Sequence, residues 1–288
     1  MIRKLLRWIG YVLAAILLIA LIFAAWVWFA SGRVLSARYE GRPERLATPS
    51  AAQLADAGRQ ARIQGCTHCH GEQLQGTMMF DGQPFATVWA PNLTELATRA
   101  TDQQLARAIR QGIGHDGRAL FIMPSDQYSR MSDEEVAALI AHIRAAPRRG
   151  EATARIAWGP IGRFALAMGQ MEPIMTKVAD YALREPYDTG PGEAVGRRLA
   201  ANGCSSCHGP DLSGQPSPEG GPPAPDLAIA AAYDLAQFRT LLRTGVPPGG
   251  RDLGLMKEVA ARNLSHLNEE EVGQIHTYLR ARAERVSR

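Results

Sequence analysis

The chain has 288 residues, 46% of them hydrophobic and 21% charged, and its formal net charge at pH 7 is +4. Residues 1–45 hold seven Arg or Lys and two Glu, a net charge of +5, so residues 46–288 sum to about −1. The basic excess therefore belongs to the N-terminal segment, where it can meet anionic lipid headgroups. The sequence has no basic stripe interleaved with aromatic residues, which argues against a nucleic-acid partner.

Residues 8–30 form an uncharged run of 23 residues rich in Leu, Ile, Ala and aromatic side chains. As a helix this run rises about 1.5 Å per residue, enough to cross a hydrocarbon core ~30 Å thick. The apolar core of a cleaved signal peptide is shorter, about 7–15 residues, and Leu35-Ser36-Ala37 is a weak cleavage site. We therefore predict an uncleaved anchor that contacts membrane lipid. Basic residues flank both ends, so charge counting alone does not orient it.

A Cys-x-x-Cys-His pattern occurs twice, at residues 66–70 and 204–208, and contains all the cysteines of the chain. In this pattern the two thiols add across the vinyl groups of a haem, and the histidine ligates the iron. A redox dithiol, a disulfide or half of a zinc site would not require a histidine after both pairs. The sequence thus predicts two covalent haem c groups and electron transfer, with attachment at Cys66, Cys69, Cys204 and Cys207 and iron ligation by His70 and His208.

An internal repeat extends beyond these motifs. Ala-Pro-Asn-Leu at residues 90–93 recurs as Ala-Pro-Asp-Leu at 224–227, and several residues between Leu105 and Met123 meet a similar residue 133 positions later. Each half ends in a segment that begins with a capping residue, Ser132 or Asn268, followed three positions later by Glu, which predicts a closing helix. A helix is also predicted before each motif, over 51–64 and 192–202. Gly58 and Gly196 in these helices would let the closing helix cross closely, or are simply tolerated there.

The repeat gives the domain organisation. We predict an all-α fold in which one N-terminal transmembrane helix precedes two similar helical domains. Residues 151–189 match nothing in the repeat and are predicted to be a packed connector with one short helix around Ile174–Leu183, and 214–225 to be an irregular surface loop. The predicted boundaries are 1–45 for the anchor and juxtamembrane segment, 46–150 for domain 1, 151–189 for the connector and 190–288 for domain 2.

The chain resembles the class I c-type cytochromes, duplicated in tandem over about residues 51–147 and 190–283. The two Cys-x-x-Cys-His-Gly segments, the two Pro-x-Leu segments and the methionine before each closing helix carry this resemblance. It implies two cytochrome c domains, and haem acquisition outside the bacterial cytoplasmic membrane, hence periplasmic haem domains. It also implies that the carbonyls of Pro91 and Pro225 accept from the proximal histidines, and that Leu93 and Leu227 pack on the haem faces.

The same family supplies a methionine as the sixth iron ligand. Met256 is the only methionine after Cys207, so a methionine ligand in domain 2 must be Met256. Met123 aligns with Met256 and precedes Pro124, as in the family's Met-Pro pattern. A thioether ligand stabilises ferrous iron and raises the potential of the haem. The rival ligands that the sequence leaves open are Met78, Met79, Met131 and His115 in domain 1 and His266 in domain 2.

Three functions are compatible with two such haems. The preferred hypothesis is a membrane-tethered electron carrier rather than an enzyme, whose redox partners are a dehydrogenase, a quinol-oxidising complex or a terminal oxidase. The chain also looks like the cytochromes that serve periplasmic alcohol, aldehyde and sugar-acid dehydrogenases, which commonly carry three motifs where this chain has two. The alternative is therefore a cytochrome subunit of a larger dehydrogenase or oxidase complex. A di-haem peroxidase would need an open iron position, which six-coordinate His/Met iron does not offer.

Overall fold

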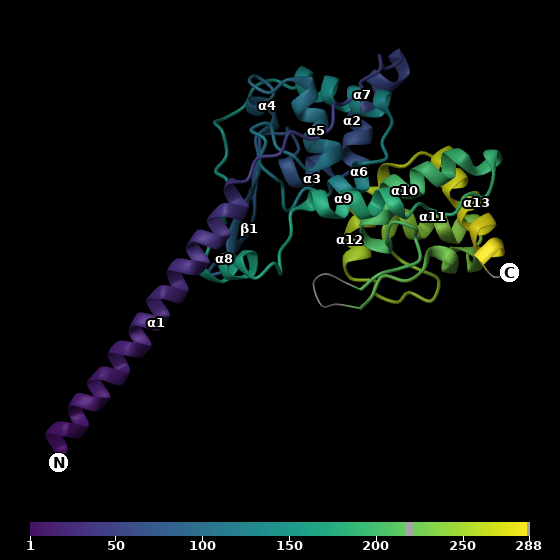
Figure 1. The fold of residues 1–288 in the computed structure, drawn as a ribbon. Helices are drawn as coiled ribbons and strands as arrows, with labels where there is room; N and C mark the ends of the chain where they lie inside the picture. The colour runs from purple at the N-terminus through teal and green to yellow at the C-terminus, as the bar shows by residue number, and fades with distance from the viewer. Residues whose placement is uncertain (217–221, 287–288) are drawn as a thin grey trace.

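A long N-terminal helix projects from a body of two helical domains (Figure 1). This computed structural model describes residues 1–216 and 222–286. Helix α1 (Ile2–Ser36) is long and apolar enough to cross a membrane, and is the one such helix within the described ranges. The prediction of a mostly helical chain with an N-terminal apolar helix is confirmed. Residues 217–221 of the predicted 214–225 loop, and 287–288 at the end of predicted domain 2, lie outside the described residues.

The first domain is built around a leading helix and a closing helix that cross. Helices α2 and α7 both start at a capping box, from Ser50 and Ser132, in which the side chain accepts from the third residue of the helix. Between them lies a short hairpin that the sequence did not predict. The elements are α2 (Ala51–Ile63), α3 (Cys66–His70), β1 (Thr77–Gly82), β2 (Ala86–Ala90), α4 (Leu93–Leu96), α5 (Asp102–Gln111), α6 (Ser125–Tyr128) and α7 (Asp133–Ala145).

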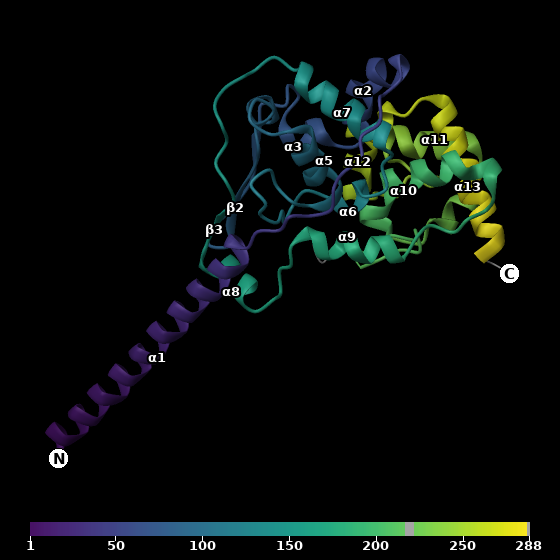
Figure 2. The same ribbon diagram turned by 45° about the horizontal axis from the view of Figure 1, so that its top comes forward.

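The connector packs on both domains. Its first strand, β3 (Ala157–Trp158), adds antiparallel to β2 and completes a three-stranded sheet of order β1-β2-β3. Helix α8 (Pro160–Ala167) follows, and α9 (Ile174–Leu183) coincides with the one connector helix predicted from sequence. Helix α9 packs on α6 of domain 1, and the Tyr181 hydroxyl donates to the backbone carbonyl of Ser205 in domain 2 at 2.8 Å. Figure 2 shows α6, α9 and α10 side by side at the junction.

The second domain repeats the helices of the first, and its described residues form no sheet. Its haem motif is the last turn of the helix that leads into it, whereas in domain 1 a break at Gln64 and Gly65 separates α2 from α3. The elements are η1 (Pro191–Glu193), α10 (Ala194–His208), η2 (Leu227–Ala232), α11 (Leu235–Thr244), α12 (Leu255–Arg262), η3 (Leu264–His266) and α13 (Glu269–Val286).

Glycine permits a close helix crossing in domain 2. A Cβ atom on Gly196 of α10 would lie 2.1 Å from the backbone oxygen of Gln274 and 2.9 Å from Cβ of Tyr278, both in α13. The close approach predicted for Gly196 is therefore confirmed. The crossing is looser at Gly58 of domain 1, where a Cβ would meet only the His142 ring of α7, at 3.2 Å.

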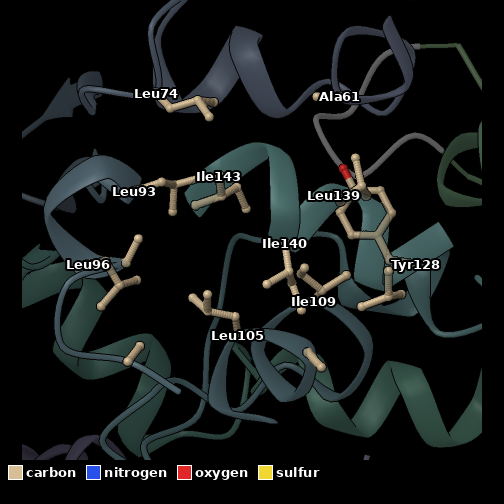
Figure 3. Close-up of a cluster of buried hydrophobic side chains, with 14 of the residues drawn as sticks. Ala61, Leu74, Leu93, Leu96, Leu105, Ile109, Tyr128, Leu139, Ile140 and Ile143 are labelled. Carbon is tan, nitrogen blue, oxygen red and sulfur yellow. The ribbon is translucent and has the colours of Figure 1, made fainter. Parts of the chain in front are cut away.

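Each domain has its own apolar core, and one residue of domain 1 belongs to the second core. Figure 3 shows the first, in which Leu93 and Leu96 face Ile140 and Ile143 of α7. The second gathers around Val272, Ile275 and Leu279 of α13. Ile63, at the end of α2 in domain 1, is 6% exposed and belongs to this second core. The chain just before the first haem motif is therefore held by domain 2.

Polar contacts also join the two domains. Arg59 of α2 forms ion pairs with Asp56 of its own helix and Glu271 of α13, both at 2.6 Å. Burial raises the pKa of Glu271, but the Arg59 hydrogen bond and the other polar contacts outweigh this effect, and the pKa stays below its usual value. Asn263 donates to the carbonyl of Arg62, and Arg130 donates to that of Pro210 at 3.0 Å. Both haem motifs therefore lie beside the domain junction.

The crossing at Gly196 gives a test of the fold. In Gly196→Ala the added methyl would meet the α13 backbone, so the helices must separate, at a cost of about 1–3 kcal/mol. Gly273→Ala is the matched control, since a Cβ there meets nothing within 4 Å and alanine favours the helix by about 1 kcal/mol. Thermal unfolding followed by circular dichroism should show a lower midpoint only for Gly196→Ala. Equal midpoints would contradict the close crossing.

Candidate haem sites

The two motif histidines make the same hydrogen bond. Nδ1 of His70 lies 2.8 Å from the carbonyl oxygen of Pro91, and Nδ1 of His208 lies 2.8 Å from that of Pro225. A carbonyl can only accept, so Nδ1 carries the proton and Nε2 keeps a lone pair for a metal. Burial lowers the pKa of both rings more than these hydrogen bonds raise it, which keeps the imidazoles neutral. Each ring is thus held in the tautomer that can ligate iron.

A repeated loop brings each proline carbonyl to its histidine. Leu74 and Leu212, each four residues after the motif histidine, are buried and have positive φ angles of 59° and 66°. Their carbonyl oxygens accept from the backbone N–H of Leu93 and Leu227, at 2.9 and 3.0 Å. Leucine rarely adopts positive φ, so the surrounding packing must impose it. Sequence reasoning missed both leucines, although their equal spacing from the motifs was a signal.

The middle residue of Pro-x-Leu anchors this loop in domain 1. The Asn92 side chain is buried, and its Nδ2 donates to the carbonyls of Arg149 and Glu151 at 2.6 and 2.9 Å. Its Oδ1 accepts from the Thr94 hydroxyl and from the backbone N–H of Glu95, which caps α4. The chain that follows the closing helix is thereby tied to the residue beside Pro91.

Domain 2 uses an ion pair for the same purpose. Asp226 accepts from Arg282 of α13 at 2.6 Å and from the backbone N–H of Ala228 at 2.7 Å. Burial raises the pKa of Asp226, but these two hydrogen bonds outweigh it and hold the pKa below its usual value. The Arg282 side chain is buried, so removing either partner would leave a poorly compensated charge. Sequence reasoning had not singled out Arg282.

The surroundings of the motif cysteines do not fit a zinc site or a redox dithiol. Cys66 packs against the first core and Cys204 against the second, so the two pairs do not form one four-cysteine site. Among the described residues, no three His, Cys, Asp or Glu groups come together to hold a metal ion. Burial raises the pKa of the Cys66 and Cys204 thiols to about 12 each. A redox dithiol needs a lowered pKa, whereas a neutral thioether suits an apolar setting.

The predicted methionine ligands lie at these same cores. Met123 packs against the first core, where Cys66 and Leu93 also lie, and Met256 packs against the second with Cys204 and Leu227. Met131 is buried in the first core too, so the repeat alignment still distinguishes Met123 from it. Met78 and Met79 instead lie exposed on β1.

The closing-helix histidines have structural contacts of their own. His142 lies over Gly58 at the crossing of α2 and α7. Nε2 of His276 lies 2.8 Å from the carbonyl oxygen of Tyr233, and its ring packs on Phe238. Two histidines are rival ligands. His115 lies in a turn after α5, and its backbone carbonyl accepts from the Gln104 side chain. His266 is the last residue of η3, and its backbone carbonyl accepts from the Arg59 side chain.

These residues fit a covalently attached haem. In each half a neutral imidazole donates its Nδ1–H to a backbone carbonyl. The apolar core of the same half includes or contacts a motif cysteine, the Pro-x-Leu leucine and a methionine. That combination offers two thiols for attachment, a nitrogen and a sulfur for iron, and apolar surface for the porphyrin. The fold and both sites define a c-type cytochrome.

Comparison with known proteins agrees with this assignment. Residues 53–143 match the family model described as cytochrome c oxidase, cbb3-type, subunit III, and residues 193–283 match that of cytochrome c. The chain belongs to the c-type cytochromes: it has two tandem cytochrome c domains, binds two covalent haem c groups and serves electron transfer.

Two relatives are dehydrogenase subunits. The chain is 26% identical to the fructose dehydrogenase cytochrome subunit of Gluconobacter japonicus, over 75% of this chain and 50% of the relative. It is 25% identical to the gluconate 2-dehydrogenase cytochrome c subunit of Pantoea cypripedii, over 77% of this chain and 57% of the relative. The chain therefore spans about half the length of the curated relatives it matches.

Asn92 provides a test of the loop anchor. Asn92→Ala would remove a helix cap, worth about 1 kcal/mol, and leave buried groups unpaired at about 1–3 kcal/mol. We expect domain 1 to lose about 2–4 kcal/mol of stability in denaturant unfolding followed at the Soret band. Gln73→Ala, at an exposed position of the same loop, should change stability by less than about 0.5 kcal/mol. Similar losses of stability in both variants would show that Asn92 does not anchor the loop.

Proposed function

We propose that the protein is a membrane-tethered electron carrier whose two haem domains lie in the periplasm. Helix α1 supplies the tether, and its length and apolar composition support a transmembrane role. Covalent haem attachment outside the cytoplasmic membrane, implied by the family, favours the periplasmic side for the body. A tether keeps the haems near membrane-bound partners and so raises their effective concentration there.

We assign the iron ligands as His70 with Met123 in domain 1 and His208 with Met256 in domain 2. The single observation that carries the proposal is the pair of identical hydrogen bonds from Nδ1 of each motif histidine to its proline carbonyl. These bonds fix the ring orientation and increase the donor strength of Nε2. The haem iron supplies one-electron chemistry, and the chain's residues hold it, exclude water and set its potential.

We further propose that electrons pass between the haems across the domain junction. The first motif adjoins domain 2, because Ile63 lies in the second core and Asn263 donates to the carbonyl of Arg62. The second motif adjoins domain 1 and the connector, because Arg130 donates to the carbonyl of Pro210 and Tyr181 to that of Ser205. Packing of this kind favours a fixed separation between the two centres.

Met123→His tests the ligand assignment. Replacing the neutral thioether with imidazole should lower one midpoint potential by on the order of 100 mV or more, since axial ligands set haem potentials over about 0.8 V. The other potential should be nearly unchanged. A redox titration followed by visible absorption measures both. Met131→His is the control. A large change of midpoint potential in Met131→His with none in Met123→His would show that Met131, not Met123, is the iron ligand.

A second candidate is a cytochrome subunit of a larger dehydrogenase complex. The names of both relatives favour it, and a sugar or sugar-acid dehydrogenase would then be the electron donor. Purification of the full chain from its native membrane in mild detergent should yield a stoichiometric partner if it is a subunit. A haem protein that elutes alone, and is reduced by added dehydrogenase at a rate that depends on concentration, would favour the mobile carrier.

A further inference from the structure

Helix α8 of the connector is apolar on both of its faces. One face is buried: a Cβ on Gly162 would lie 2.4 Å from the carbonyl oxygen of Phe85 in domain 1, and the Leu166 side chain is 2% exposed. Ile161, Phe164 and Met168 recur at helical spacing on the other face, where Ile161 is 53% and Met168 51% exposed. The only charged side chain in this helix is Arg163. A surface helix in contact with water would carry polar residues on its outer face.

The single charge of α8 is turned toward the membrane anchor. The Arg163 guanidinium lies 3.8 Å from the centre of the Trp28 ring, and its Nη1 donates to the hydroxyl of Ser31, a fully buried residue of α1. Phe164 packs on Phe23 of α1, with ring centres 6.1 Å apart. Helix α8 therefore lies alongside the last turns of α1, as both overall views show (Figures 1 and 2).

These contacts set the depth of α8. Phe23 precedes Ala30, the last residue of the apolar run, by seven positions, which is about 10 Å along a helix. Helices that lie in a membrane interface bury their apolar face about 5–10 Å into the boundary between headgroups and acyl chains. The part of the run before Phe23, residues 8–22, is about 22 Å long, too short for a ~30 Å hydrocarbon core. The turns that α8 contacts are therefore needed for the span.

We propose that α8 is a second membrane-contacting element, whose outer face of Ile161, Phe164 and Met168 inserts among the lipids beside α1. Arg163 then lies at the level of the headgroups, where a cation over a tryptophan ring is a stable arrangement. The occupant of the face is lipid, because the face continues the lipid-contacting surface of α1. This inference rests on the proposal that α1 spans the membrane.

Insertion of α8 would fix how domain 1 stands on the membrane. The N–H groups of Gly159 and Ile161 donate to the carbonyls of Phe85 and Pro84, at 2.8 and 3.1 Å, so α8 is tied to the tip of the hairpin. The hairpin in turn begins at Thr77, seven residues after His70 of the first haem motif. Domain 1 is then held by two points, α1 and α8, rather than by a flexible stalk, and the first haem keeps a constant height and tilt.

Depth-dependent quenching on the full-length haem protein tests this inference. The native cysteines are expected to be thioethers, so the unmodified protein should take up no maleimide dye, and a single introduced cysteine can be labelled. The variants are Ile161→Cys and Met168→Cys in α8, Leu17→Cys within the span, and Leu54→Cys, 47% exposed on α2, as the matched control. Each is placed in phosphatidylcholine–phosphatidylglycerol vesicles with and without brominated acyl chains, and the ratio of the two signals cancels quenching by haem.

We expect brominated lipid to quench the dye several-fold more at residues 161 and 168 than at residue 54, with the strongest quenching at residue 17. Dye at residues 161 and 168 that is reached by aqueous iodide and not by bromine would overturn the inference. Dye shielded from both quenchers would also overturn it, since another protein or a second copy would then cover the face. Absence of quenching at residue 17 would instead refute the span of α1, so the two failures are distinguishable.

Discussion

The hydrogen bond between each proximal imidazole and a proline carbonyl is the contact around which both domains are organised. It requires the chain to return to the motif after a loop whose length differs between the domains. Twenty residues separate His70 from Pro91, and 16 separate His208 from Pro225. A strained leucine and an anchored Asn or Asp secure that return in each domain. Leu93 and Leu227, two residues after these prolines, then pack at the two apolar cores, which also contain residues of the closing helices.

Features encoded by local chemistry were predictable from sequence. The Cys-x-x-Cys-His spacing identified the cofactor, and the capping residues Ser132 and Asn268 marked the starts of α7 and α13. The stretch between Pro173 and Pro186 located α9. Gly196 was interpretable because a helix interior tolerates glycine poorly unless something needs the space. In each case the signal lies within a few residues of the feature that it specifies.

Features that depend on distant contacts were not predictable. The sheet was missed because β1 carries three adjacent exposed apolar residues and a bulge, so it lacks the alternation of a half-buried strand. Positive φ at Leu74 contradicts the preference of leucine and arises only from packing. Arg282 could not be linked to Asp226 because 56 residues separate them. Helix α8 has a Gly-Pro start, but its apolar residues surround the helix, so periodicity gave no face.

The two repeated haem domains of this chain are no longer independent units. Ile63 completes the core of the other half, and Arg59 shares its charge with Glu271 across the junction. Excising either half, or exchanging it for a homologous copy, would separate Ile63 from the core that it completes and would break the ion pair between Arg59 and Glu271. Sequence drift in one haem domain is therefore constrained by the other, and the pair must evolve as a single body.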